Sequence, residues 1–372
     1  MAKDIARTGW FESNRCRWLT GTGAALILAL SLFKSLAAAS QTASMSPPQT
    51  LQDTGLYSDF GTLQIDPKHL AFAPQYPLWS DGALKRRWIS LPPGTVIDAS
   101  DPDDWVFPVG TRLWKEFSFD GRRVETRFLE RQAGGQWLYA AYAWSTDGRE
   151  AQLVPAKGKR GAHALGGGRS HTIPGINDCK ACHQGGRSEV LGFSTLQLSP
   201  DRDPNAPHGE ASPTPNVNLQ YLVEKGLLVG LPRSLLETPP RIKTASATER
   251  AALGYMHGNC GHCHNERGPL QNVGLFLRHG FRTTSEPAIS STTSQPVKKM
   301  APGQSPDAVL RVEPGHPERS GLMQRIASRS PALQMPPLGT ELIDDEAVSL
   351  LRRWIAEMDD LRKEAHQEPK GR

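Results

Sequence analysis

The chain has 372 residues, of which 38% are hydrophobic and 22% are charged. This is enough to bury a sizeable core, so the composition excludes a wholly disordered chain. The formal charge is +5, and it falls to +2 without the first 39 residues, which hold five basic and two acidic side chains. No basic run interleaved with aromatic residues follows, so nothing favours nucleic-acid binding.

The N-terminus has the three parts of a secretory signal. Basic residues precede an apolar stretch from Trp18 to Phe33, and Ala37-Ala38-Ala39 follows. We predict cleavage after Ala39 and export to the periplasm by the general route, because no twin-arginine pair is present. The alternative is an uncleaved membrane anchor, since the apolar stretch is long for a signal and Lys34 interrupts it. Residues 40–70, rich in Ser, Thr, Gln and Pro, are predicted to be a linker or an irregular segment.

Alternating apolar and polar residues indicate strands in the next segment. They run over 112–119, 124–131 and 136–144, with turn residues Asp120-Gly121 and Gly134-Gly135 between them. This pattern predicts an antiparallel meander within a β-rich domain at 71–156.

Helical signals follow the Lys/Gly/Arg-rich stretch 157–170, which we interpret as a linker. A short helix is expected at 217–225, and Ser246 to Glu249 form a capping box for a helix that leads into 260–264. Asp344 or Asp345 caps a C-terminal helix with one apolar stripe. The predicted fold class is therefore α+β. The β domain is followed by two mainly α-helical, cytochrome c-like segments, 157–245 and 246–362, and by a polar tail, 363–372.

The cysteines carry the most specific signal. Cys16 lies in the predicted signal, and the other four form two Cys-x-x-Cys-His motifs, at 179–183 and 260–264. This motif is typical of c-type haem attachment, because the two thiols match the two vinyl groups and the histidine reaches the iron. A zinc ribbon needs no histidine after each pair, and a thioredoxin-like dithiol needs a βαβ context. We therefore expect two haem c groups, with thioether attachment and axial iron ligation by these residues: Cys179, Cys182 and His183 for the first, and Cys260, Cys263 and His264 for the second.

Each iron also needs a sixth ligand or a vacancy. Met335 is the candidate for the second haem, because prolines stiffen its loop, and Met300 and Met323 are weaker alternatives. No methionine lies between His183 and Tyr255, so the first haem has no ordinary methionine loop. Its candidates, in descending order of preference, are His171, Met256, His208, His163 and His257, and an open iron is a further alternative.

These motifs resemble a family of exported bacterial dihaem c-type cytochromes with a β-rich N-terminal domain. The similar segments include Tyr76 to Gly82, Phe107 to Thr111, Asn259 to His264 and Met335 to Thr340. Residues 246–358 also resemble class I cytochrome c, whereas the first haem segment departs from it by lacking the methionine loop.

The motifs and the resemblance imply one-electron transfer by a periplasmic carrier. The expected partners are redox proteins: a dehydrogenase or quinol-oxidising donor and a soluble cytochrome or other acceptor. The alternative is a dihaem peroxidase with an open first iron, although its motifs are usually further apart than the 81 residues between Cys179 and Cys260. The β domain could also dock the protein on a partner enzyme or polysaccharide.

Overall fold

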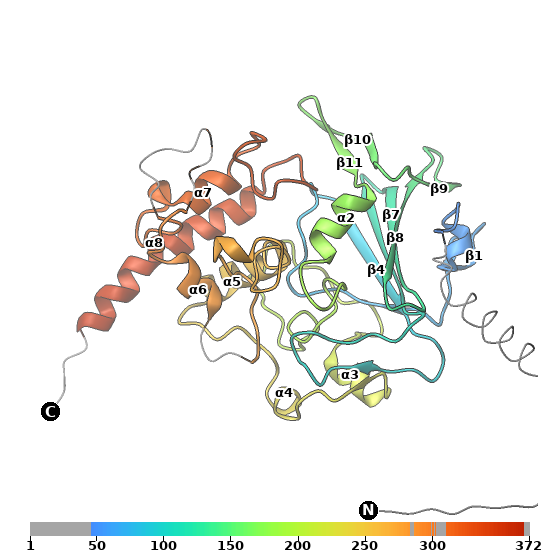
Figure 1. Cartoon of the computed structure of the whole chain (residues 1–372), viewed down its shortest axis with the longest axis horizontal. Coiled ribbons are helices and arrows are strands. Elements are labelled where there is room, and N and C mark those ends of the chain that lie inside the picture. Colours follow the sequence, from blue (N-terminus) through green and yellow to red (C-terminus); the bar gives the residue numbers. More distant parts are fainter. Residues whose placement is uncertain (1–45, 283–285, 299, 301, 303–309, 368–372) are drawn as a thin grey trace, which may run out of the picture. The chain divides into compact units, whose positions relative to one another are not determined.

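The computed structural model describes residues 46–282, 286–298, 300, 302 and 310–367, with side chains up to Met358 (Figure 1). The predicted export signal, 1–39, lies outside these residues. The strands are β1 (Tyr57–Asp59), β2 (Gln64–Ile65), β3 (Leu70–Ala71), β4 (Leu84–Ser90), β5 (Ile97–Asp98), β6 (Arg112–Phe119), β7 (Arg122–Arg131), β8 (Trp137–Trp144), β9 (Ala151–Leu153), β10 (Lys159–Gly166), β11 (Arg169–Ile173) and β12 (Leu228–Val229). The helices are α2 (Ile176–His183), α3 (Leu219–Glu224), α4 (Ser234–Glu237), α5 (Ala247–Asn259), α6 (Pro287–Thr292), α7 (Gly321–Ile326) and α8 (Asp345–Gln367).

A six-stranded antiparallel sheet is the largest element, in the order β3-β4-β6-β7-β8-β9. Asp120 and Gly121 both have positive φ, 50° and 75°, and join β6 to β7 in the two-residue turn that suits a twisted hairpin. The predicted meander over 112–144 is therefore confirmed, with strand ends within two residues of the prediction.

One face of the sheet carries an aromatic row. Trp88, Trp114, Phe128 and Ala140 lie opposite one another on adjacent strands and are buried together with Leu51. The segment that contains Leu51 packs on this face, so part of the stretch predicted to be a linker or an irregular segment, 40–70, belongs to the core. Burial of these tryptophans agrees with a core-packing role.

The predicted fold class is wrong in its second half. Among the described residues the helices are a minority beside the β-strands and loops, and no clear helical cytochrome segments follow the β domain there. The predicted linker 157–170 contributes to the β10–β11 hairpin, which turns at Gly166 to Gly168, all with positive φ. The rest of 157–245 crosses the second face of the sheet, where Val190, Phe193 and Leu222 share a core with Leu113 and Leu129 of β6 and β7. This segment lacks long apolar repeats, so it covers the sheet and does not build a helical core of its own.

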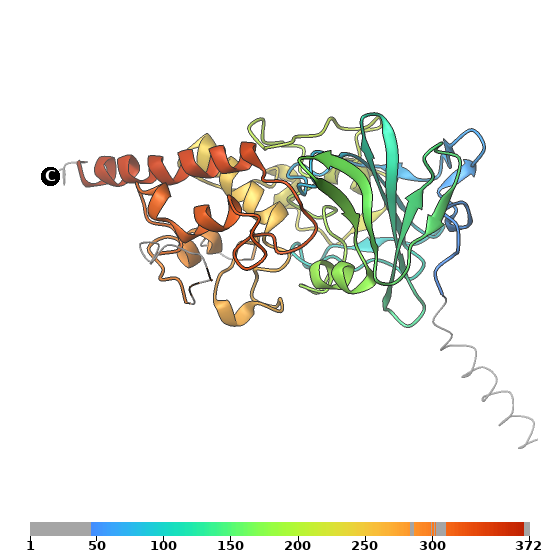
Figure 2. The same cartoon turned by 90° about the horizontal axis from the view of Figure 1, so that it is seen from above.

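The C-terminal part has a smaller helical layer. Helices α5 and α8 pack together, and α8 buries the predicted stripe, including Leu351, Trp354 and Ile355. Asp344 caps α8 by accepting a hydrogen bond from the backbone N–H of Ala347 at 3.1 Å. These helices lie at one end of the described region and the sheet lies at the other (Figure 2). Helix α8 continues to Gln367, into the predicted polar tail.

None of the helices in the described ranges combines the length and hydrophobicity needed to cross a membrane.

Candidate functional site

The first Cys-x-x-Cys-His motif lies on α2, which packs against β8. Asp178 accepts a hydrogen bond from the backbone N–H of Gly175 at 2.9 Å and places a negative charge in the first turn, where it favours the helix. Cys179 and Cys182 are one turn apart and both line a cavity of about 390 Å³. The helix therefore presents both thiols to the same space.

His183 ends α2 with its ring held in one orientation. Nδ1 donates to the backbone carbonyl of Glu189 at 2.6 Å, so the lone pair of the neutral ring is on Nε2. Burial lowers the pKa of His183 to about 4, which keeps the imidazole neutral at physiological pH. Glu189 also accepts a hydrogen bond from the Tyr139 hydroxyl, and Tyr139 packs on the histidine ring. This arrangement is typical of a metal-ligating histidine oriented by a neighbouring acceptor.

The second motif follows α5 and lies in a turn. The backbone N–H of His264 donates to the carbonyl of Cys260 at 2.9 Å, which preserves a helix-like spacing between the two cysteines. Burial lowers the pKa of His264 to about 4, and its buried Nδ1 has no hydrogen-bond partner in the described part of the chain. A buried, unpartnered nitrogen on a neutral ring fits a site that receives a ligand.

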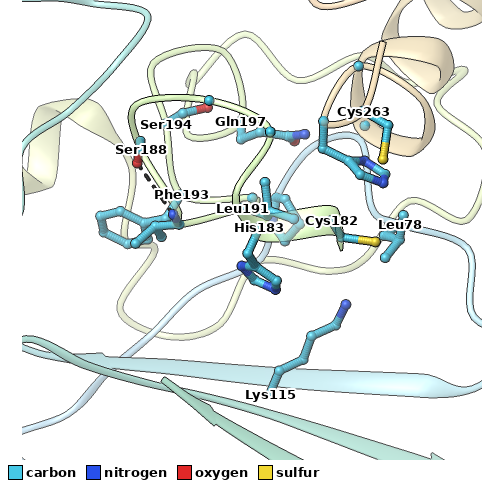
Figure 3. A pocket seen from close by; sticks show the side chains of 18 of the residues that line it. Leu78, Lys115, Cys182, His183, Ser188, Leu191, Phe193, Ser194, Gln197 and Cys263 are labelled. Atoms are coloured by element: carbon cyan, nitrogen blue, oxygen red, sulfur yellow. Dashed lines mark hydrogen bonds between the residues drawn. The ribbon is translucent and has the colours of Figure 1, made fainter. Parts of the chain in front are cut away.

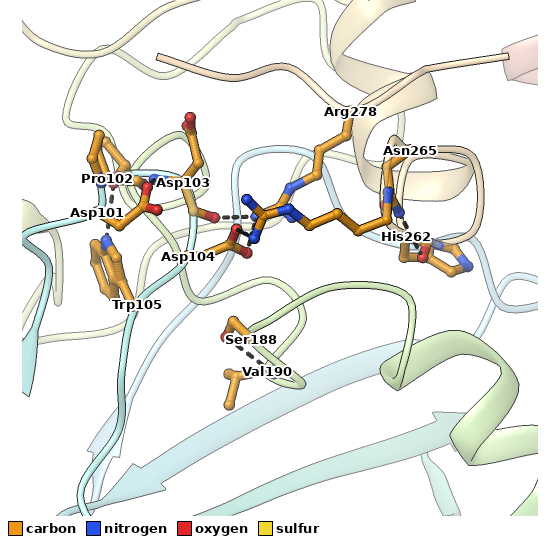
Figure 4. A network of polar contacts seen from close by, with 12 residues as sticks. Asp101, Pro102, Asp103, Asp104, Trp105, Ser188, Val190, His262, Asn265 and Arg278 are labelled. Atoms are coloured by element: carbon orange, nitrogen blue, oxygen red, sulfur yellow. Dashed lines mark hydrogen bonds and ion pairs between the residues drawn. The ribbon is translucent and has the colours of Figure 1, made fainter. Parts of the chain in front are cut away.

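Three polar anchors hold the second motif against the β domain. Asn259 accepts a hydrogen bond from the backbone N–H of Trp79 at 2.7 Å. Arg278 donates to Asp103 and pairs with Asp104 at 3.0 Å, and Asp103 also accepts from the backbone of Phe281 at 2.7 Å (Figure 4). The loop that carries these aspartates therefore fixes the segment after the motif.

The fold brings the two motifs side by side, although they are 81 residues apart in the sequence. The side-chain ligand atoms of Cys182, His262 and Cys263 all lie within 4.8 Å of one another. The Cys263 thiol also lies 3.6 Å from the carbonyl of Ala181. Gly185 allows this approach, because a β-carbon at that position would collide with the backbone carbonyl of His262. The contact between the motifs is therefore made by backbone as well as by side chains.

The thiols of both motifs are free. A hydrogen bond with Cys263 and burial together raise the pKa of Cys182 to about 12, and burial raises the pKa of Cys179 to about 11. The same hydrogen bond lowers the pKa of Cys263. The first motif therefore holds protonated thiols, the form that can add S–H across a vinyl double bond with no leaving group.

The cavity is lined mainly by apolar and aromatic side chains. Its floor is the second face of the sheet, and its other walls include both motifs, residues between 185 and 197, and residues 336–340. Figure 3 shows the amine of Lys115, on β6, directed from the sheet toward His183 and Cys182. A partly open, mainly apolar space with two thiols, a neutral histidine and nearby cations fits a flat apolar cofactor with carboxylate groups. The apolar lining includes Phe72, Trp105, Leu129, Val190 and Phe193.

The fold separates the candidates for the sixth ligand of the first iron. His171 does not line the cavity. It is buried between Glu125, at 3.0 Å, and Asp81, at 3.7 Å. Burial lowers the pKa of His171, but the adjacent carboxylates of Asp81 and Glu125 outweigh it, so the pKa lies above the ordinary 6.5. The two carboxylates therefore hold the His171 ring away from the cavity, where it cannot serve as the predicted sixth ligand.

The other candidates for the sixth ligand of the first haem also lie outside the cavity, with one exception. Met256 is fully buried in the helical core, His163 stacks on Phe119, and His208 pairs with Asp344. The exception, His257, reaches the cavity, but its Nδ1 accepts the backbone N–H of His279 at 3.1 Å. The proton of the neutral ring is then on Nε2, which leaves no lone pair for a metal.

Met335 begins the loop that forms part of the cavity wall. Its backbone N–H donates to the carbonyl of Arg325 at 3.0 Å, and Arg325 is an electrostatic neighbour of His264. Asp81 anchors the end of this loop by accepting from the backbone of Glu341 at 2.7 Å and of Leu342 at 2.9 Å. The two residues predicted as the axial pair of the second iron therefore share a neighbour. Met300 is partly exposed, and Met323 is buried in the helical core.

Sequence reasoning missed Lys115, Arg127 and His279, which all line the cavity. A signal for the first two was present, because the strand alternation places Lys115 between Leu113 and Phe117 on a buried face. Lysine and arginine are seldom buried without a partner, so a cation on the apolar side of a strand is an informative observation. His279 lies in an irregular segment that gave no such signal.

No protein-family model, no curated protein and no solved structure shows significant similarity to this chain.

Proposed function

We propose that this protein is a c-type cytochrome that binds one haem at each Cys-x-x-Cys-His motif and transfers single electrons between redox partner proteins. Haem supplies reversible one-electron chemistry at iron when it is bound. The supporting observation is the contact of the two motifs, with the Cys182 and Cys263 side chains in one cluster. Electron tunnelling weakens steeply with distance, so two attachment sites in contact favour exchange between them.

The chain's own residues would perform the binding. Cys179 and Cys182 would form two thioethers on one side of the cavity, and His183 would present Nε2 to the iron. At the second motif Cys260 and Cys263 would form the two thioethers and His264 would bind the iron, with Met335 as the sixth ligand. Arg127 lies beside the first pair of thiols and would balance the negative charge of a haem carboxylate.

The partners and location follow from the same proposal. A dehydrogenase or quinol-oxidising enzyme would donate electrons, and a soluble cytochrome or another acceptor would receive them. The motif requires export before attachment, in agreement with the predicted signal and a periplasmic location. A peroxidase remains the alternative activity, and it requires an open iron at the first motif.

The experiment is expression of the full chain in a host that matures c-type cytochromes. We expect the intact mass of the denatured protein to increase by two haems. Paired replacement of Cys179 and Cys182 by Ala should remove one haem, and paired replacement of Cys260 and Cys263 by Ala should remove the other. A wild-type protein without covalent haem would refute the proposal.

A second function has one specific observation in its favour. The Cys182, His262 and Cys263 cluster could hold a metal ion such as zinc, which prefers four sulfur or nitrogen ligands. The described residues supply three, and the raised pKa of Cys182 disfavours its thiolate. This reading also leaves both histidines that end the motifs unused. Elemental analysis that finds stoichiometric zinc, together with no covalent haem, would favour it.

A further inference from the structure

The cavity floor carries more positive charge than its own acidic residues neutralise. Arg87, Lys115 and Arg127 lie directly opposite one another on β4, β6 and β7, in a row across the sheet. Like charges in this position repel. Glu210 pairs with Arg87 and Glu125 pairs with Arg127, at 2.5 Å in the second case.

Lys115 is the exception in this row. Among the described residues its side-chain amine makes no hydrogen bond and no ion pair, and it lies 4.8 Å from the centre of the Phe117 ring. Its electrostatic neighbours are the cations Lys85, Arg87 and Arg127, with Glu210 as the opposing charge. Burial first, and then the cations Arg87, Arg127 and Lys85, lower the pKa of the Lys115 amine well below its ordinary value, so loss of the proton, which leaves a nitrogen lone pair, is favoured.

Lys115 and His183 enter the cavity from opposite walls. His183 extends from the end of α2, and Lys115 rises from the sheet below it (Figure 3). The other polar side chains on the floor are unsuitable as ligands, because guanidinium groups have no lone pair to offer and the Tyr139 hydroxyl already donates to Glu189.

We propose that the Lys115 amine is the sixth ligand of the iron held by His183. The inference rests on the proposed function, because it requires haem at the first motif. Ligation forms one coordination bond from the amine lone pair and displaces no group. Ligation by the neutral amine also removes a positive charge from the row of Arg87, Lys115 and Arg127. This explains why a lysine lies there without an acidic partner. Lys115 would then close the position that a peroxidase needs open.

The test uses the full-length haem-loaded protein and its ferric spin state, measured by electron paramagnetic resonance and optical spectroscopy. We expect two low-spin haems in the wild type. Lys115→Ala should convert one of the two to high spin while the intact mass still shows two haems. Lys115→Met should keep that haem low-spin and add a near-infrared sulfur-to-iron band. Lys225→Ala, which removes a cation that neither lines the cavity nor acts on Lys115, should leave both haems low-spin.

Several outcomes would overturn the inference. A high-spin first haem in the wild type would show that the position is open and would favour the peroxidase alternative. Two low-spin haems in Lys115→Ala would exclude the lysine, and His279, whose Nδ1 is bonded to Glu286 at 2.6 Å, would be the next candidate. Absence of covalent haem at Cys179 and Cys182 is a different failure, seen by mass, and it would refute the proposed function together with this inference.

Discussion

Gly185 offers the most direct test of the contact between the motifs. A β-carbon there meets the backbone carbonyl oxygen of His262, and because the backbone fixes the position of a β-carbon, no side-chain rotation relieves the collision. Forcing an extra methyl group into a packed contact costs about 1–3 kcal/mol. We expect Gly185→Ala to lower the free energy of unfolding by about this amount.

Gly186 provides the matched control. A β-carbon there lies 3.1 Å from the guanidinium end of Arg278, which can move. Gly186→Ala should therefore change stability by no more than about 0.5 kcal/mol. Both variants can be compared by denaturant unfolding followed by circular dichroism at equal haem content. If Gly185→Ala is as stable as Gly186→Ala, the close approach of the two motifs is wrong.

Three further predictions concern the anchors and ligands. A double-mutant cycle with Arg278→Ala and Asp104→Ala should give a coupling energy of about 0.5–3 kcal/mol in unfolding experiments. Additive effects would show that this ion pair does not join the segment after the second motif to the β domain. Met335→Ala should abolish the near-infrared sulfur-to-iron band of the second haem at unchanged haem content, and a band that persists would exclude this ligand. His171→Asn should reduce stability most at acidic pH: the folded-state pKa of His171 is raised, so its contribution is complete below the ordinary value of 6.5 and is lost as pH rises through the folded value. Unfolding of wild type and variant at several pH values tests this, and a difference that grows with pH would contradict it.

Local patterns determined much of the β domain. The alternation over 112–144 and the Asp120-Gly121 turn were sufficient to predict three strands, because the side-chain period of a strand and the left-handed turn are properties of neighbouring residues. The C-terminal helix and its buried stripe were predictable for the same reason. The two Cys-x-x-Cys-His motifs are likewise local, since both thiols and the histidine lie within five residues.

The tertiary structure decided which residues surround the two motifs. Residues 157–245 lack a strong period, so only their packing on the sheet shows that they form a hairpin and a covering layer, and the predicted helical segment is wrong. Only the tertiary structure places His171 between two carboxylates and directs the Lys115 amine toward His183. The adjacency of Cys182 and Cys263 also depends on contacts between distant segments, with Gly185 allowing the backbones to meet. Such contacts join residues about 80 positions apart, and no local pattern records which distant surfaces will be buried together.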